Sequence, residues 1–125
     1  MKKKIISTSQ IPVSGPYSVA VEAKDMIFIS GQLPFDPATG EMISDIGKAT
    51  RQVLTNIQII LKKTDLDISH IVKTTIFLKN IKDFPIVNEI YAGFFPEEPP
   101  ARSTIEASVL PGGALIEIEA VAVRE

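Results

Sequence analysis

The sequence contains no cysteine, no tryptophan and a single histidine, His70. Without cysteine there is no disulfide, no thiolate metal site, no iron–sulfur cluster and no cysteine nucleophile. One histidine excludes a multi-histidine metal site within one chain and argues against a Ser-His-Asp triad. The P-loop, GxGxxG, HExxH and GxSxG motifs are also missing. We therefore expect any chemistry to proceed without a metal or a cofactor.

Neither sign of charge is in large excess, and no long hydrophobic run is present. Thirteen Lys and Arg face fifteen Asp and Glu, a net charge of −2, so the basic footprint of a nucleic-acid-binding protein is missing. No apolar run approaches the roughly 20 residues that span a bilayer. The basic start Met1–Lys4 is followed only by Ile5 and Ile6, which is too short for a signal peptide. These features predict a cytoplasmic protein that binds neither nucleic acid nor membrane.

The composition is that of an ordinary globular chain. Hydrophobic residues make up 45% and charged residues 22% of 125 residues, which predicts one domain over residues 1–125. A chain of this mass buries roughly two thirds of its unfolded surface, enough for a core without cross-links.

Hydrophobic periodicity predicts an α+β domain. Lys24-Asp25 alone separates two β-rich segments, which indicates a hairpin. From Ile46 to Leu61 apolar residues recur with helical spacing after a cap at Ser44 or Asp45. A second helix is predicted after a cap at Asp83, ending before a stiff, extended segment at 96–100. Strand patterns occupy residues 2–7, 17–23, 26–31, 70–79, about 102–109 and 114–124. The order β-β-β-α-β-α-β-β predicts two helices on one face of a mixed sheet.

Two helices cover only one face of such a sheet, yet the strands are apolar on both faces. Segments 19–21, 27–29 and 76–78 lack the alternation of a sheet exposed on one side. We therefore expect the open face to meet another copy of the chain, because a large exposed apolar patch is a liability.

Charged residues near strand ends are the candidates for chemistry. Arg102 follows a rigid proline-rich segment and is suited to gripping a carboxylate bidentately, or to pairing on the surface with a glutamate at position 97, 98 or 106. Glu117 and Glu119 share one face of the last strand, either lining a site or as solvated charges.

Other polar residues have both functional and structural interpretations. Tyr17 is placed to close over a ligand or to pack at a strand start, and Asn88 interrupts an apolar stretch of the second helix. Ser30 and Gly31 end a strand, which is typical of a turn. For His70 a structural or solvated role is favoured.

Several separated motifs occur along nearly the whole chain. They are GPY at 15–17, ISGQLP at 29–34, VNEIYAGFF at 87–95, PPARS at 99–103 and LPGGALIEIEAVAV at 110–123. Together they resemble the reactive intermediate deaminase (Rid, or YjgF) family. The resemblance implies a chorismate-mutase-like fold assembled as a homotrimer, with sites in the clefts between subunits. It also implies hydrolysis of 2-imino acids, such as 2-iminobutanoate and 2-iminopropanoate, or their enamine tautomers, to 2-oxo acids and ammonia.

The resemblance also implies roles for individual residues. Arg102 matches the arginine that holds the substrate carboxylate, and its presence resembles the deaminase-active branch. Glu117 matches the acidic residue that positions or activates water, with Glu119 ranked below it. Tyr17 resembles an aromatic residue contributed by the neighbouring subunit. Supporting pocket positions are matched by Ser30, Gly31 and Asn88.

One departure and three alternatives accompany this interpretation. Thr104 stands where many family members have cysteine, so thiol chemistry is excluded, while its backbone remains able to contact water. A non-catalytic module that binds small carboxylates would use the same arginine. A ribonuclease or translation-inhibitor role would require a basic stripe with stacking aromatics, which the sequence lacks. A chaperone-like role is not addressed by the sequence.

Overall fold

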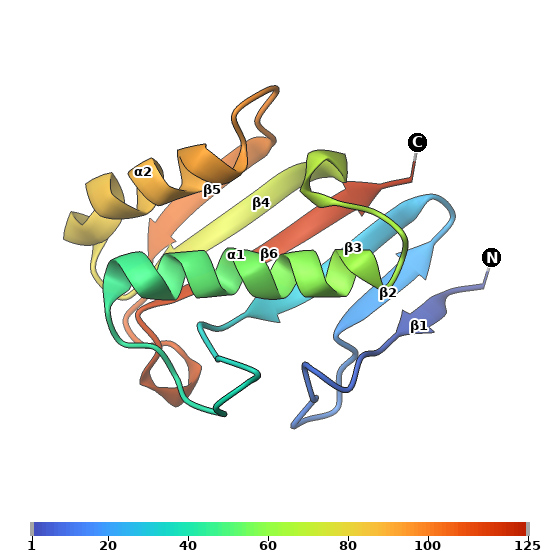
Figure 1. The fold of residues 1–125 in the computed structure, drawn as a ribbon, viewed down its shortest axis with the longest axis horizontal. Helices are drawn as coiled ribbons and strands as arrows, with labels where there is room; N and C mark the ends of the chain where they lie inside the picture. Colours follow the sequence, from blue (N-terminus) through green and yellow to red (C-terminus); the bar gives the residue numbers. More distant parts are fainter. Residues whose placement is uncertain (1, 125) are drawn as a thin grey trace.

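The computed structural model describes residues 2–124, which form a six-stranded sheet with two α-helices on one face (Figure 1). The observed order is the predicted β-β-β-α-β-α-β-β. The elements are β1 (Lys4–Ile6), β2 (Ala20–Ala23), β3 (Met26–Gln32), α1 (Ile46–Lys62), β4 (Ile71–Leu78), α2 (Phe84–Phe94), β5 (Ala101–Glu106) and β6 (Ile116–Val123).

The sheet is mixed, as predicted, with strand order β1-β2-β3-β6-β4-β5. Only β4 and β5 run parallel, and every other neighbouring pair is antiparallel. The predicted hairpin joins β2 to β3 around Lys24, whose φ of 56° supplies the left-handed turn. Strands β1 and β5 form the two edges, so Arg102 lies on an edge strand.

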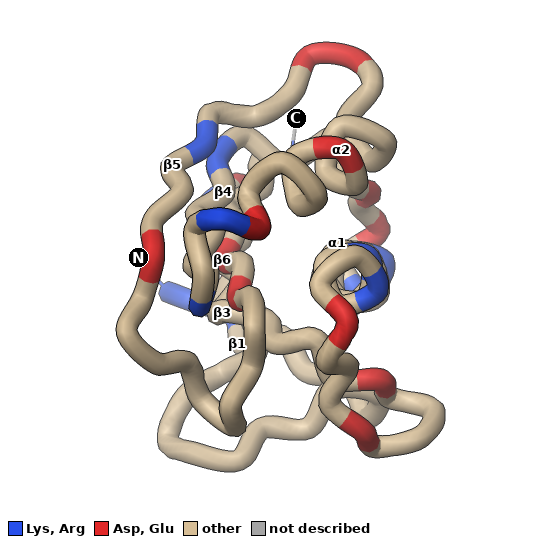
Figure 2. Tube along the Cα trace, turned by 90° about the vertical axis from the view of Figure 1, so that its left-hand side faces the viewer, with Lys and Arg blue, Asp and Glu red and all other residues tan. Residues whose placement is uncertain are grey.

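Helix α1 packs against β3, β6 and α2, and its buried side follows the predicted stripe. Asp45 caps it, its carboxylate accepting a hydrogen bond from the Lys48 backbone N–H at 3.0 Å. Figure 2 shows both helices on the same side of the sheet. The core between the two layers is formed by fully buried residues that include Val53, Leu54, Ile57, Ile60, Ile76, Ile116 and Ile118.

The polar residue Asn56 lies within the buried face of α1, although the apolar stripe did not predict a buried residue there. Its side-chain amide donates to the backbone carbonyls of Leu33 at 3.2 Å and Phe35 at 2.8 Å. These bonds satisfy a buried amide and fix the loop between β3 and α1 against the helix.

Asp83 is the N-cap residue of α2, as predicted, and Pro85 lies in the first turn, but the Asp83 side chain makes no capping hydrogen bond. Asn80 accepts from the Lys82 N–H at 3.0 Å and begins a 3₁₀ turn, Ile81–Asp83, that runs directly into α2.

The prediction for the chain after α2 is wrong. The segment 96–100 is bent rather than extended, because Glu98 adopts a left-handed φ of 47°. Pro96, Pro99 and Pro100 fix their own φ, so the bend falls on Glu98 between them.

The face of the sheet opposite the helices carries apolar side chains that remain accessible. Phe28 is 44% exposed and Met26 40%, and the partly exposed side chains of Val21, Phe77 and Val121 lie on the same face. No helix in residues 2–124 has the length and apolar character needed to cross a membrane.

Candidate functional site

Arg102 lies where β5 faces helix α2, beside a cavity of about 430 Å³. It is in register with Thr74 of β4 on the helix-covered face of the sheet. Asn88, Tyr91 and Pro100 also line the cavity. Within residues 2–124, no hydrogen bond or ion pair joins the Arg102 guanidinium to any group, including the three glutamates considered as surface partners. The structure therefore brings Arg102 and Asn88 together and leaves the guanidinium donors free.

Glu117 lies on the opposite, open face of the sheet, in register with Phe77 of β4. Partial burial raises the pKa of the Glu117 carboxyl above its usual value, and the nearby charge of Glu119 raises it further. A carboxyl with a raised pKa is suited to exchanging protons near neutral pH.

Gly31 creates the space that the Glu117 side chain occupies. A β-bulge places Ser30 and Gly31 together opposite Glu119, between the pairs Ile29–Ala120 and Gln32–Ile118. A Cβ atom built on Gly31 would overlap Oε2 of Glu117 and lie 2.8 Å from its Cδ. Any side chain at position 31 therefore displaces the carboxylate.

We expect Gly31→Ala to lower the free energy of unfolding by about 1–3 kcal/mol, the usual cost of an overpacked contact. Urea denaturation measures this change, and Glu117→Ala in the same chain should restore most of it by emptying the space. Gly93→Ala is the matched control, because nothing lies within 4 Å of a Cβ at that helical position. Equal stability of Gly31→Ala and wild type would contradict the contact.

Tyr17 and Gly31 line a second cavity, of about 250 Å³, between the β3–α1 loop and the segment before β2. The Tyr17 side chain is 53% exposed at the mouth of this mostly apolar cavity. Ser30 lies beside it and donates its hydroxyl to the Ser18 carbonyl at 2.6 Å. That bond gives Ser30 a structural role, because it joins the end of β3 to the segment just before β2.

One chain does not bring all the predicted site residues together. Arg102 and Asn88 lie on the helix side near the β5 edge, whereas Glu117 lies two strands away and faces the other side. Gly31 lies against the Glu117 carboxylate and also lines the cavity that Tyr17 lines. The predicted site therefore falls into two half-sites within one chain.

The remaining candidates have distinct environments. Thr104 is in register with Ile76, on the same side of the sheet as Arg102, and its buried Oγ1 has no hydrogen-bond partner among the described residues. Glu119 is exposed and lines a shallow cavity on the open face with Lys73 and Thr75. His70 approaches the Asp67 carboxylate at 3.2 Å and closes a 3₁₀ turn, which is the structural role favoured from the sequence.

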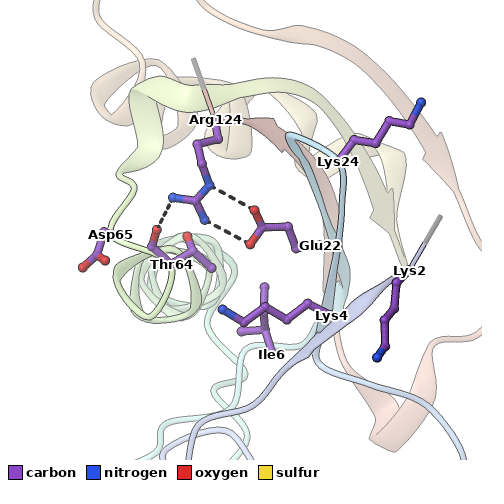
Figure 3. Close-up of a pocket in the computed structure, with 8 residues that line it drawn as sticks. All are labelled: Lys2, Lys4, Ile6, Glu22, Lys24, Thr64, Asp65 and Arg124. Carbon is purple, nitrogen blue, oxygen red and sulfur yellow. Dashed lines mark hydrogen bonds and ion pairs between the residues drawn. The ribbon is translucent and has the colours of Figure 1, made fainter.

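A further hollow, of about 530 Å³, is lined by residues of β1 and β2, by Arg124 just after β6, and by Thr64 and Asp65 just after α1 (Figure 3). Arg124 donates to both carboxylate oxygens of Glu22 at 3.0 Å and to the Thr64 carbonyl at 2.9 Å. These bonds connect β6, β2 and the chain just after α1. The hydrogen bonds from Arg124 lower the pKa of Glu22, so the pair stabilises the fold at neutral pH and less so as the pH falls below about 4.5.

Sequence reasoning did not identify the residues around Arg102. The Arg102 Cζ atom lies 5.2 Å from the ring centroid of Phe84 and 4.9 Å from that of Tyr91. The sequence pattern of the second helix indicates only inward-facing core positions for both rings. A tyrosine at an inward helical position was the available signal, because a buried tyrosine hydroxyl requires a partner.

The fold and the two half-sites define an α+β protein with a partly buried glutamate and an arginine whose guanidinium has no hydrogen-bond partner among residues 2–124. The family model described as Endoribonuclease L-PSP matches residues 7–124. The chain therefore belongs to this family, which is the Rid (YjgF) family that its motifs resemble.

Named relatives share nearly the full length of the chain. A RutC family protein of Pyrococcus horikoshii is 46% identical, covering 98% of this chain and 99% of its own. The 2-iminobutanoate/2-iminopropanoate deaminase of Escherichia coli is 44% identical, covering 97% and 98%. The crystal structure of E. coli TdcF with bound serine superimposes with a TM-score of 0.93 at 38% identity, covering 98% and 99%. The predicted chorismate-mutase-like α+β fold class is confirmed by such neighbours.

Proposed function

We propose that this protein hydrolyses small 2-imino acids and their enamine tautomers to 2-oxo acids and ammonia, at sites completed between the subunits of a homotrimer. The observation that carries the proposal is the Arg102 guanidinium, which lines a cavity with its donors unpaired among the described residues. A relative named for this deamination is 44% identical over nearly the whole chain. A related structure, TdcF, binds serine, which carries the carboxylate such an arginine recognises.

The proposed reaction needs orientation and proton transfer more than a strong nucleophile. A protonated imine is already electrophilic at C2, so water adds there once the carbon is held in place. Arg102 binds the carboxylate through two parallel N–H donors. Glu117 accepts a proton from the attacking water and passes it to the nitrogen. As the C–N bond breaks and ammonia leaves, Glu117 takes the proton of the new hydroxyl group, so that the C2=O bond forms. The proton that the imine carried at the start is released with the products. The overall change is imino acid plus water to 2-oxo acid plus ammonia.

An interface between copies would unite the two half-sites. The face that carries Glu117 also exposes Phe28 and Met26, which a second copy would bury. The chain exposes 7256 Å² as a monomer, against about 6,600 Å² for a typical monomer of its mass. Both features favour an oligomer, and the trimer is the form that the family resemblance implies.

The endoribonuclease in the family description has less support here. The net charge is −2, and Figure 2 shows basic and acidic segments interspersed along the trace, without a continuous basic stripe in that view. Binding of an RNA backbone relies on such a stripe.

The test generates 2-iminobutanoate in situ with threonine dehydratase and follows the formation of 2-oxobutanoate with and without this protein. We expect the protein to accelerate the formation of 2-oxobutanoate. We also expect it to sediment as a trimer. A folded trimer that binds 2-oxobutanoate without accelerating its formation would instead establish the carboxylate-binding module. The absence of both binding and acceleration would refute the proposal.

A further inference from the structure

The surroundings of Arg102 are aromatic rather than acidic. Its Cζ atom lies 5.2 Å from the Phe84 ring centroid and 4.9 Å from the Tyr91 ring centroid. Phe84 and Tyr91 are seven residues apart in α2, so they lie two turns apart on one helix face, about 10.5 Å along the axis. The guanidinium therefore meets both rings between these turns.

These contacts hold the cation without using its hydrogen-bond donors. An aromatic face attracts a guanidinium through its quadrupole, whereas a carboxylate partner would occupy the N–H groups. Among the described residues no acceptor bonds to Arg102. The five N–H donors of the planar guanidinium thus have no acceptor among the described residues, and Arg102 lines the cavity.

Tyr91 is itself held in place by the strand next to Arg102. Its hydroxyl lies 2.7 Å from Oγ1 of Thr74, and both side chains are buried. Thr74 is the β4 residue in register with Arg102. The Tyr91 ring also packs against Phe95, with centroids 4.6 Å apart. Thr74 thus pairs with Arg102 in the sheet and bonds the Tyr91 hydroxyl, and the Tyr91 ring in turn contacts the Arg102 guanidinium.

We infer that Phe84 and Tyr91 are positioning residues that hold Arg102 ready for a bidentate bond to the substrate carboxylate. The assignment of that carboxylate to a 2-imino acid rests on the proposed function. A mobile arginine side chain loses conformational entropy when it binds a ligand. An arginine whose guanidinium is already held by two rings loses less. The tyrosine hydroxyl fixes the ring, and the ring fixes the guanidinium.

The test measures 2-oxobutanoate binding by calorimetry for Tyr91→Leu and Tyr91→Phe. We expect Tyr91→Leu to weaken binding about 3- to 30-fold, equivalent to about 0.7–2 kcal/mol. Tyr91→Phe keeps the ring and should stay within about 3-fold of wild type. In turnover, the change should fall mainly on KM. Equal binding by wild type and Tyr91→Leu would overturn the inference.

A matched control and a second measurement separate positioning from folding. Phe94→Leu removes another partly buried ring of α2 that packs on the core, and we expect it to leave binding unchanged. The neutral analogue 2-oxobutanamide should bind wild type and Tyr91→Leu equally. Loss of binding by Phe94→Leu to the same extent as Tyr91→Leu would indicate a general packing effect and overturn the inference.

The Arg102 Nε–H resonance provides a test that does not depend on the ligand. Ring currents should shift it from the free-arginine position in wild type and Tyr91→Phe, and Tyr91→Leu should move it toward that position. If wild type neither binds 2-oxobutanoate nor accelerates its formation, the proposed function fails, while this shift still decides the positioning role. An unshifted resonance in wild type would overturn the role.

Discussion

Arg102→Ala is expected to lower kcat/KM for 2-iminobutanoate by at least roughly 10- to 150-fold. The change removes a charge-assisted hydrogen-bond partner of the substrate carboxylate, which costs about 1.5–3 kcal/mol. Because the Arg102 guanidinium makes no hydrogen bond or ion pair among the described residues, its removal leaves no buried acceptor unsatisfied. The thermal stability should therefore change much less than the activity.

The dehydratase-coupled assay measures this effect, with Arg102→Lys as the comparison. Lysine keeps the positive charge but loses the planar fork that matches a carboxylate, so we expect an intermediate rate. Arg102→Ala with full activity, in a protein that remains folded and oligomeric, would mean that the carboxylate is held elsewhere. That outcome would also remove the basis for the positioning role of the two aromatic rings.

Glu117→Gln is expected to reduce kcat by about 10²- to 10⁴-fold, the range typical of a lost general acid–base group. Glutamine keeps the size of the side chain but cannot accept a proton. Binding of 2-oxobutanoate should be retained, since Arg102 remains. Lost turnover with retained binding would distinguish an enzyme from a carboxylate-binding module.

The matched control is Glu119→Gln, on the same face of β6 and two residues away. Glu119 is exposed, and it raises the pKa of Glu117. Its neutralisation should therefore lower that pKa and shift the acidic limb of the rate profile to lower pH, with little loss of maximal rate. A larger loss of kcat for Glu119→Gln than for Glu117→Gln would mean that Glu119, and not Glu117, is the acid–base group.

Glu117→Gln should also change the pH dependence of stability in a defined direction. A carboxyl whose pKa is higher in the folded state contributes most stability below its unfolded value, about 4.5, and loses that contribution as the pH rises through the folded value. Glu117→Gln should consequently unfold at a higher temperature than wild type near pH 7. The two melting temperatures should converge below about pH 4.5. A stabilised but inactive variant is the usual sign of a functional group held at a cost to stability.

Much of the architecture followed from local patterns. The spacing of apolar residues from Ile46 to Leu61 predicted the buried side of α1, because a 3.6-residue period permits only one inward stripe. The two-residue separation at Lys24-Asp25 predicted the hairpin. Asp83 takes the predicted N-cap position of α2, but its side chain makes no capping bond, since Asp83 already ends the 3₁₀ turn that Asn80 begins.

The contacts around the candidate site depended on register. The pairing of Thr74 with Arg102 brings Tyr91 of α2 next to the guanidinium. The bulge at Ser30 and Gly31 sets the space for Glu117. Neither contact follows from sequence spacing, because strands β3, β4, β5 and β6 meet by long-range pairing.

The sequence alone determined the fold class, the apolar character of both sheet faces and the family, because periodicity, composition and motifs are local properties of the chain. It also supplied the candidate residues, including Arg102 and Glu117. Only the tertiary structure decided that these two face opposite sides of the sheet, since side-chain direction on a strand depends on pairing register and on bulges. It also decided that aromatic rings, and not acidic groups, surround the arginine.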